Sequence, residues 1–481
     1  MNSRGKYLIK NVGILTISNF ASKILVFLLV PLYTSVLSTE DVGIYDLVIS
    51  TVSLLFPILS LNIVDALMRF LMDKSKSKTE VASIGLRYVA VSNLPVLVFL
   101  IISSRIEALR GIHGLEVYIF LYYLFSCLNQ YCIQFAKGIE LVSAMGIAGV
   151  LGTITMLGAN VSLLLIAKAG LSGFFTANIL GQAIPALYLL YKTRVWQYIS
   201  GAGINKELRK EMLIYCVPLI ATAVGWWVNN ASDKYVVTWL CGIAANGILS
   251  VSYKIPAIIH TLQTIFTQAW QISAVKEYGE KDTSAFYGRT FAVLNVFMSA
   301  ACSCLIILAK PIGHILYQKE FFVAWQYVPF LLIASVFNSA SGFLGPILSA
   351  KKASKPMAMS AVYGASANVI MNIVFVHFIG IQGATIATVI SSFIIYWVRK
   401  RAVDDEISIE AYGKVLITWL LLCGQAVLEI YTPFWWAEVI LMIIMLALNW
   451  HEIKRIIKMV NPYVKRRGKT DEKGCNCSDE A

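Results

Sequence analysis

Residues 226–271 decide the fold because they place charged side chains inside apolar runs: WWVNNASDKYVVTWLCGIAANGILSVSYKIPAIIHTLQTIFTQAWQ. The stretch contains two hydrophobic segments of helical length, and each has a lysine in its interior, Lys234 in the first and Lys254 in the second. About 20 apolar residues cross the hydrocarbon core of a membrane, so we expect two membrane helices here. A lysine inside such a helix needs water or a counter-charge beside it.

A polar face runs along the second of these helices. Its members recur in alternating steps of three and four, the spacing that puts residues on one side of an α-helix. They are Gly247, Ser250, Lys254, Ala257, Thr261, Thr264, Gln268 and Gln271. This pattern is typical of a helix with its back to lipid and its polar stripe toward a water-filled cavity. The alternative is a helix packed through small residues, with Lys254 extending to the membrane interface.

The composition of the whole chain also indicates a membrane protein. The 481 residues are 58% hydrophobic and only 14% charged, which excludes a soluble globular domain and indicates an all-α, polytopic membrane protein. The first apolar run, residues 8–30, is long enough to cross the membrane, so no cleavable signal peptide is predicted. We predict fourteen spans, centred near residues 19, 56, 94, 125, 156, 183, 227, 258, 298, 338, 368, 390, 422 and 444.

The net charge of +13 is a topology signal rather than a sign of nucleic-acid binding. With the N-terminus inside, 31 of the 40 Lys and Arg residues fall in the inner segments and five in the outer ones. The positive-inside rule then puts both termini in the cytoplasm. Cys475 and Cys477 lie in the polar tail, where we expect a reduced, unstructured segment rather than a metal site.

The polar stripe has a counterpart in the first half of the chain. This counterpart consists of Gly43, Asp46, Ser50, Ser53, Pro57 and Ser60. Adding 204 to these numbers gives Gly247, Ser250, Lys254, Ala257, Thr261 and Thr264 of the polar stripe. Two further matches have offsets of 211 and 210: residues 19–23 (NFASK) with 230–234 (NASDK), and 170–177 (GLSGFFTA) with 380–387 (GIQGATIA). Three matches at nearly one offset predict an internal duplication.

We therefore predict two lobes of six helices each, followed by a helix pair and a tail. The N-lobe covers residues 1–200, the C-lobe 201–402, the extra helix pair 403–450 and the cytoplasmic basic tail 451–481. Because each repeat has an even number of spans, the repeats run parallel, related by an axis along the membrane normal. Transporters that rock about a central site have this architecture.

Three segments resemble the bacterial polysaccharide (O-antigen type) flippases of the multidrug/oligosaccharidyl-lipid/polysaccharide exporter superfamily. They are residues 11–50 (NVGILTISNFASKILVFLLVPLYTSVLSTEDVGIYDLVIS), 61–70 (LNIVDALMRF) and 233–255 (DKYVVTWLCGIAANGILSVSYKI). The most specific fragments are Val42–Tyr45, Asp233–Lys234 and Asn246–Gly247. The resemblance implies a V-shaped, fourteen-helix transporter that moves undecaprenyl-diphosphate-linked oligosaccharides from the inner to the outer leaflet during cell-surface polysaccharide biosynthesis.

The same resemblance implies a non-enzymatic protein without a cofactor or a metal, whose partners are the lipid-linked oligosaccharide, the bilayer and other polysaccharide-assembly proteins. Two alternatives stay open. A multidrug or toxic-compound exporter of the same fold would have an acidic cavity for organic cations. A membrane-embedded polysaccharide polymerase would need a large external loop carrying Arg or His, and the longest outer segments here are those near 104–114 and 310–325.

The candidate site consists of polar residues inside the predicted helices. Each charge at a helix centre costs about 3 kcal/mol against lipid, so these must face water or each other. Three lysines against two aspartates favour a diphosphate, which a lysine binds and releases more readily than an arginine clamp does. The charged members are Lys23, Asp46, Asp233, Lys234 and Lys254.

Amide side chains and tryptophans complete the candidate site. Asn19, Asn229, Asn230, Gln268 and Gln271 would hydrogen-bond sugar hydroxyls. Trp226 or Trp227 would stack on a sugar ring, or belong to an interfacial aromatic belt. Asp65 and Arg69, four residues apart, are interpreted as a structural ion pair within one helix. The membrane potential would drive the transport cycle that the resemblance implies, or Asp46 or Asp233 would couple transport to a proton or a sodium ion.

Overall fold

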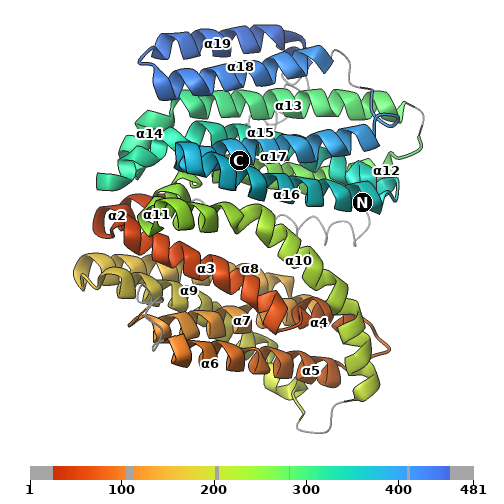
Figure 1. Cartoon of the computed structure of the whole chain (residues 1–481). Coiled ribbons are helices and arrows are strands. Elements are labelled where there is room, and N and C mark those ends of the chain that lie inside the picture. The colour runs from red at the N-terminus through yellow and green to blue at the C-terminus, as the bar shows by residue number, and fades with distance from the viewer. Residues whose placement is uncertain are drawn as a thin grey trace, which may run out of the picture. The chain divides into compact units, whose positions relative to one another are not determined.

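The computed structural model confirms the all-α class. The residues that it describes form helices and no strand (Figure 1). They are residue 25 and residues 27–103, 113–200, 205–280, 282–408 and 412–455. Asn19, Lys23, most of the first predicted span and the basic tail from residue 456 onward lie outside this part of the chain.

The helices of the first half are mostly long and are joined by short turns. In chain order they are α2 (Val30–Val36), α3 (Thr39–Leu59), α4 (Ile63–Leu71), α5 (Lys78–Val91), α6 (Asn93–Ser103), α7 (Glu116–Gly138), α8 (Val142–Asn160), η2 (Val161–Ile166), α9 (Gly170–Thr193) and η3 (Val195–Tyr198).

The second half opens with the longest helix of the described chain. Its elements are α10 (Lys206–Cys241), α11 (Ile243–Ser252), α12 (Pro256–Lys276), α13 (Thr283–Ile307), α14 (Ala309–Leu316), η4 (Lys319–Tyr327), α15 (Val328–Ala350), α16 (Ser354–Ile379), α17 (Ile381–Ala402), α18 (Tyr412–Tyr431) and α19 (Trp435–Leu448).

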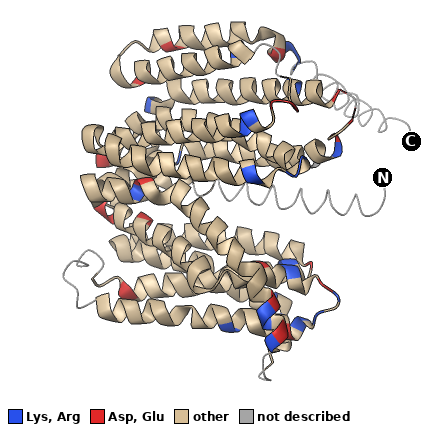
Figure 2. Ribbon diagram, turned by 45° about the vertical axis from the view of Figure 1, so that its right-hand side comes forward, with Lys and Arg blue, Asp and Glu red and all other residues tan. Residues whose placement is uncertain are grey.

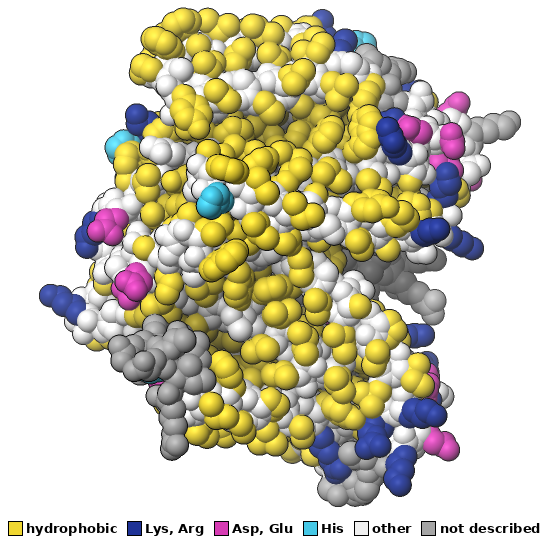
Figure 3. Space-filling model, viewed as in Figure 1, with side chains coloured by type: hydrophobic (Ala, Val, Ile, Leu, Met, Phe, Trp, Pro, Cys, Tyr) yellow, Lys and Arg dark blue, Asp and Glu magenta, His cyan; other side chains and the backbone are white. Residues whose placement is uncertain are grey.

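Ten helical segments of the described chain are long and apolar enough to cross a membrane. On the face drawn in Figure 3, hydrophobic side chains cover the middle of the helices. Figure 2 shows most of the Lys, Arg, Asp and Glu residues toward the helix ends. The chain is therefore a multi-span membrane protein, and the figure of fourteen spans stays a prediction. The ten segments are Thr39–Leu59, Lys78–Ser103, Val142–Ile166, Gly170–Thr193, Lys206–Cys241, Thr283–Ile307, Lys319–Ala350, Ser354–Ile379, Ile381–Ala402 and Tyr412–Tyr431.

The single helix expected along the polar stripe of residues 247–271 is divided in two. α11 ends at Ser252 and α12 begins at Pro256, so Lys254 lies in the turn between them rather than in a helix interior. Pro256 occupies the first turn of α12, where its missing N–H costs nothing, and it cannot continue a helix that comes from α11. The expectation of one continuous helix was wrong, and the proline is the reason.

The second predicted span is divided in the same manner. α3 ends at Leu59 and α4 begins at Ile63, and between them Leu61 and Asn62 both have a φ of 51°. Non-glycine residues rarely adopt this left-handed conformation, so two in succession end the helix. As a result, α4 runs as a separate short helix that packs against α7.

The chain divides into two compact units. The first comprises Met1–Lys254, Gly313–Ala324 and Asn368–Ala384; the second comprises Ile255–Ile312, Trp325–Ala367 and Thr385–Ala481. These units follow from packing, whereas the lobes 1–200 and 201–402 were predicted from sequence similarity between the halves. The lobe boundaries, the helix pair 403–450 and the tail 451–481 therefore stay predictions.

Each unit has its own aromatic core. In the first, Tyr131 on α7 is fully buried, and its hydroxyl donates to the Ala82 carbonyl at 3.0 Å. In the second, Trp270 stacks on Phe343 with ring centroids 4.3 Å apart and donates its indole N–H to the Phe343 carbonyl at 2.8 Å. These rings bury large apolar areas while their polar atoms keep hydrogen-bond partners inside the protein.

The motifs GLSG at 170–173 and GIQG at 380–383 share one backbone feature, a left-handed first glycine. Gly170 and Gly380 lie at the starts of α9 and α17, with φ values of 55° and 60°. At the second glycine of each motif a Cβ would collide with preceding residues: 2.9 Å from Ala169 Cβ at Gly173, and 2.3 Å from the Phe375 carbonyl carbon, near the end of α16, at Gly383. Both motifs thus turn into a helix through a left-handed glycine, and the duplication stays a prediction.

This turn gives a stability test. Gly170→Ala or Gly380→Ala forces a left-handed alanine at a cost of about 1–2 kcal/mol, although the space beside each Cα is open. We expect each variant to lower the thermal midpoint in detergent by a few degrees. As matched controls, Gly149→Ala and Gly158→Ala add a methyl group in open space within α8 and should be neutral or stabilising. Equal midpoints in all four variants would contradict the strained turns.

Candidate functional site

α3 places its polar side chains in a fixed register because its start is capped. The Ser38 hydroxyl accepts a hydrogen bond from the Asp41 N–H at 3.1 Å, and the Asp41 carboxylate accepts one from the Ser38 N–H at 3.0 Å. This reciprocal capping box satisfies N–H groups that have no partner in the first turn. From that start, Gly43, Asp46 and Ser50 follow on one face of the helix.

The helices α3 and α11 meet with almost no side chain between them. A Cβ built on Gly43 would lie 2.2 Å from the Ile243 carbonyl oxygen, and one built on Gly247 would lie 1.9 Å from the Thr39 carbonyl oxygen. Real Cβ atoms do not approach other atoms so closely, so the contact requires glycine on both sides. The two glycines that the repeat makes equivalent therefore face each other across this contact.

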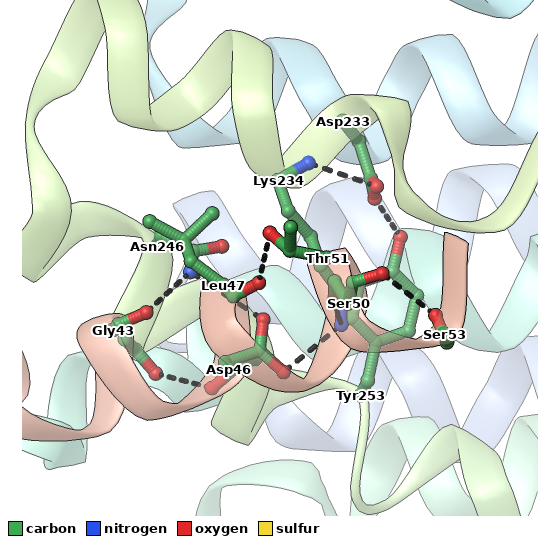
Figure 4. Close-up of polar contacts among 12 residues, drawn as sticks. Gly43, Asp46, Leu47, Ser50, Thr51, Ser53, Asp233, Lys234, Asn246 and Tyr253 are labelled. Carbon is green, nitrogen blue, oxygen red and sulfur yellow. Dashed lines mark hydrogen bonds and ion pairs between the residues drawn. The ribbon is translucent and has the colours of Figure 1, made fainter. Parts of the chain in front are cut away.

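The close contact brings α10 and α11 within reach of Asp46. Lys234 Nζ lies 2.9 Å from Asp46 Oδ1 and donates to Ser50 Oγ at 3.2 Å (Figure 4). Asn246 Nδ2 donates to the Gly43 carbonyl at 3.2 Å and to Asp46 Oδ2 at 3.4 Å. Both oxygens of the Asp46 carboxylate thus have a donor. Each charged side chain of the pair is 18% exposed, so the pair is largely shielded from solvent.

Asp233, the neighbour of Lys234, faces a different environment. Its carboxylate accepts the Lys234 backbone N–H at 2.9 Å and the hydroxyl of Tyr253, and the residue is 3% exposed (Figure 4). Adjacent residues on a helix point about 100° apart, which is why Lys234 reaches α3 while Asp233 reaches Tyr253. The two neighbouring charges therefore serve different surfaces of α10.

Lys254 differs from the other charges of this region. It is half-buried in the turn after α11, and within the described residues its ammonium has no hydrogen-bond or ion-pair partner. Asp46 attracts it and Lys234 repels it, so it belongs to the same electrostatic group. Because Lys234 already pairs with Asp46, Lys254 is the cation of this group that is available to an anion.

Further hydrogen bonds between α10 and α3, and a ring contact within α10, lie beside the Asp46–Lys234 pair. Trp227 Nε1 donates to the Ser50 carbonyl at 2.7 Å, and its ring packs at 5.2 Å from that of Tyr235. The Tyr235 and Thr51 hydroxyls are hydrogen-bonded at 2.7 Å. Trp227 is therefore held against α3, while Trp226 is 65% exposed, as expected of a residue at the lipid boundary.

No side-chain hydrogen bond within the described chain joins the predicted amide residues Asn230 and Gln268 to each other or to the charged group. Asn230 is exposed, and its Nδ2 donates back to the Trp226 carbonyl at 2.6 Å. Gln268 is an exposed residue of α12, in the second unit. Asn19 and Lys23 lie outside the described residues. The structure thus groups Asp46, Asp233, Lys234 and Lys254, and the roles of the amides stay predictions.

The structure gives Asp65 other partners than Arg69. The Asp65 carboxylate accepts hydrogen bonds from Asn62 Nδ2 at 2.8 Å and Gln134 Nε2 at 3.3 Å, and its pair with Arg69 is absent from the ion pairs of the described chain. The spacing of four residues permits a pair but does not require one. Asn62, in its left-handed conformation just before α4, is close enough to bind the carboxylate first.

Sequence reasoning missed Ser50, Asn246 and Tyr253 as members of this group. Ser50 was on the predicted stripe and Asn246 in a family fragment, so both carried a signal, whereas Tyr253 carried none beyond its place beside Lys254. In the described residues no group of three or more His, Cys, Asp or Glu side chains could hold a metal ion.

The family model for polysaccharide biosynthesis proteins matches residues 8–271, more than half of the chain. The chain belongs to this family. The match covers α3, α10 and α11, and so includes every member of the charged group described above. No curated protein matches the chain by sequence.

Solved transporters share the fold of this polysaccharide biosynthesis protein. The lipid II flippase MurJ in an inward closed conformation has a TM-score of 0.66 at 15% identity, covering 92% of this chain and 99% of the flippase. An inward-facing MATE family multidrug resistance transporter of the MOP superfamily has a TM-score of 0.64 at 15% identity, covering 85% and 96%. A MOP superfamily transporter from Pyrococcus furiosus has a TM-score of 0.57 at 15% identity, covering 88% and 97%.

The glycine contact makes a prediction of its own. Gly247→Ala places a methyl group on the Thr39 carbonyl, so α3 and α11 must separate and the Asp46–Lys234 pair must lengthen. We expect a lower thermal midpoint in detergent for this variant. Gly225→Ala, with open space beside its Cα, is the matched control in α10 and should melt like the wild type. A Gly247→Ala protein that is as stable as this control would contradict the backbone contact.

A double-variant cycle tests the ion pair. Lys234→Gln leaves a shielded Asp46 without its charged partner, which we expect to cost about 2 kcal/mol of unfolding free energy. Asp46→Asn combined with Lys234→Gln removes both charges and should recover most of that loss. The measurement is the thermal midpoint and the yield of monodisperse protein for both single variants and the double variant. Additive losses would show that the two side chains do not interact.

Proposed function

We propose that this protein is a flippase for lipid-linked oligosaccharides, and that it moves an undecaprenyl-diphosphate-linked repeat unit from the inner to the outer leaflet of a bacterial inner membrane. Its family supports a role in polysaccharide biosynthesis, and its fold is one found in a lipid II flippase as well as in multidrug transporters. In this proposal both termini are cytoplasmic, and the protein acts without a cofactor or an enzymatic step.

The observation that carries the proposal is the ammonium of Lys254. A half-buried cation among membrane helices is costly unless an anion comes to it, and in the described chain the one nearby carboxylate pair is already engaged by Lys234 and Tyr253. A diphosphate would supply the missing counter-charge. Lysine binds it as a point charge with freely rotating donors, so release needs no bidentate contact to be broken.

Aromatic and hydroxyl groups beside the Asp46–Lys234 pair suit the sugar end of such a substrate. Trp227 and Tyr235 offer ring faces, while Ser50 and Thr51 offer hydroxyls on the same stretch of α3. Asn230, Gln268, Asn19 and Lys23 remain candidate contacts in this proposal. Other membrane proteins of polysaccharide assembly are its expected partners, because the flipped unit needs a polymerase or ligase on the outer side.

The membrane potential is the simplest driving force for this cycle. Moving one charge through 100 mV is worth about 2.3 kcal/mol, and an inside-negative potential helps a diphosphate outward and an empty cationic site inward. If transport is instead coupled to a proton or a sodium ion, Asp46 or Asp233 would bind that ion. Each would first have to leave its present partner, Lys234 for Asp46 and Tyr253 for Asp233.

The alternative is export of multidrug cations, which the MATE likeness of the fold keeps open. An organic cation would need an unpaired carboxylate rather than an unpaired ammonium. The two functions differ in what Lys254→Gln does. Loss of the charge should stop the export of an anionic lipid, whereas a cation exporter should keep or gain activity.

The test uses a strain that lacks this protein and carries plasmid copies of its variants. We expect Lys254→Gln to be inserted and folded but to restore less than a tenth of wild-type surface glycan, with lipid-linked glycan accumulating in the inner leaflet. Lys254→Arg should restore part of the export, because it keeps the charge but changes the geometry. Lys276→Gln, at the end of α12, is the matched control with the same loss of charge.

Two outcomes would overturn the proposal. One is normal glycan export by a stably expressed Lys254→Gln protein, and the other is a deletion strain that accumulates no lipid-linked glycan but becomes sensitive to organic cations. Export that is lost together with protein yield would assign Lys254 a structural role. In that case the same strain complemented with Lys254→Arg separates charge from folding.

A further inference from the structure

A groove lies beside the first turns of α10, far from the charged group described above. Its volume is about 610 Å³, within the range of sites that hold small molecules. The described residues that line it all come from α10: Lys206, Arg209, Lys210, Leu213, Ile214, Val217 and Pro218. Because α10 rises about 1.5 Å per residue, Lys210 and Lys234 are about 36 Å apart along the helix. The groove is thus separate from the Asp46–Lys234 pair.

The lining residues are sorted along the helix axis. Their numbers increase in alternating steps of three and one, so that each residue has neighbours three and four positions along the helix and the set forms one continuous stripe. The stripe is cationic over its first turns, up to Lys210, and apolar from Leu213 onward. A ligand that matches this order has an anionic group at one end and a hydrocarbon chain at the other.

The cations of the groove are available to such a ligand. Within the described chain Lys206, Arg209 and Lys210 have no hydrogen-bond or ion-pair partner from a side chain. Glu211, next to Lys210 on the same helix, is engaged, because its carboxylate lies 2.5 Å from Lys76 Nζ. Glu207 lies three residues before Lys210, but within the described chain it forms no ion pair with Lys206, Arg209 or Lys210. In this part of the chain the three positive charges of the stripe therefore lack an ion-pair partner.

The apolar end of the groove is open rather than covered by protein. Ile214 is 64% exposed and Val217 is 56% exposed, on a helix that is long and apolar enough to cross the membrane. In such a helix exposed apolar side chains contact lipid chains. The cationic end lies on the side that the distribution of Lys and Arg assigns to the cytoplasm, where anionic headgroups are concentrated.

We propose that this groove binds one anionic phospholipid of the cytoplasmic leaflet, with its phosphate between Lys206, Arg209 and Lys210 and the start of an acyl chain along Leu213, Ile214 and Val217. Charge complementarity and the order of cationic and apolar residues select this ligand. The site does not depend on the proposed transport of oligosaccharides. A bound lipid fixes the base of α10, the helix whose other end carries Asp233 and Lys234.

The test uses the purified full-length protein in detergent, without any oligosaccharide substrate. Phosphatidylglycerol or phosphatidylcholine is added, and native mass spectrometry counts the retained lipids while thermal unfolding reports stabilisation. We expect the wild type to prefer phosphatidylglycerol at least tenfold, with a preference that weakens as salt is raised. A ligand that binds only the folded state raises the unfolding midpoint as its concentration rises.

Variants locate the binding. Lys206→Gln, Arg209→Gln and Lys210→Gln together should abolish the preference, and the single variant Lys210→Gln should weaken it if the triple variant folds poorly. The matched control changes three exposed lysines of the same predicted side, Lys74→Gln, Lys78→Gln and Lys192→Gln, and should behave like the wild type. Ile214→Ser with Val217→Ser keeps every charge and should lower retention of both lipids, because the apolar wall is lost.

Equal retention of phosphatidylglycerol by the groove variants and the control variant would overturn the proposal, and so would a wild type without preference between the two lipids. If the groove variants keep the lipid but fail to export glycan, the groove serves the substrate and the phospholipid site is refuted. Failure of the proposed transport function is read separately, in the complemented deletion strain, and changes nothing in these binding measurements.

Discussion

The close approach of α3 and α11 is the constraint on which the charged group depends. Gly43 and Gly247 leave no room for a Cβ, so the two backbones touch where a side chain would otherwise separate them. This brings Asn246 onto the Gly43 carbonyl and places Lys234, on the neighbouring α10, at 2.9 Å from Asp46. A methyl group at either glycine would widen the gap by more than a hydrogen bond tolerates. The electrostatics of the site are therefore set by backbone packing.

Membrane helices that carry charges have few ways to stabilise them, and this chain uses two. Asp46 and Lys234 neutralise each other, with Ser50 and Asn246 completing their hydrogen bonds. Asp233 is satisfied by a backbone N–H and a tyrosine hydroxyl. Among the charged side chains of the described group, that of Lys254 alone has neither an ion-pair partner nor a hydrogen-bond partner. A buried charge whose satisfaction is left to a ligand is a common way to build a binding site, because the ligand then relieves a cost that the protein already bears.

Much of this organisation could be predicted from the sequence, because period and composition report directly on helices and lipid. The polar stripe put Asp46 and Ser50 on one face of α3, and the offset of 204 singled out Gly43 and Gly247, the two glycines that meet at the contact of α3 and α11. The errors have local causes. Pro256 ended a helix that the stripe had extended through Lys254.

The remaining misses concern partners rather than positions. The i, i+4 spacing predicted Arg69 as the partner of Asp65, whereas Asn62 donates a hydrogen bond to that carboxylate. Asn62 lies in a left-handed turn, which the periodicity of the sequence does not predict. Tyr253 as the partner of Asp233 depends on how the turn after α11 orients one ring, which is a tertiary property. Spacing identifies which residues share a face. It does not identify what lies opposite that face.

The fold by itself does not decide between the proposed flippase function and multidrug export, since the lipid II flippase and the multidrug transporter match at the same 15% identity. The distinction has to come from the charge that the site leaves unpaired. Organic cations and lipid diphosphates are both amphipathic and both fit between membrane helices, but they require opposite counter-charges. In the described group each aspartate is engaged and one lysine is left over, which is the reason that we propose an anionic substrate. Reversing that preference would require freeing Asp46 from Lys234, and the glycine contact between α3 and α11 holds that pair closed.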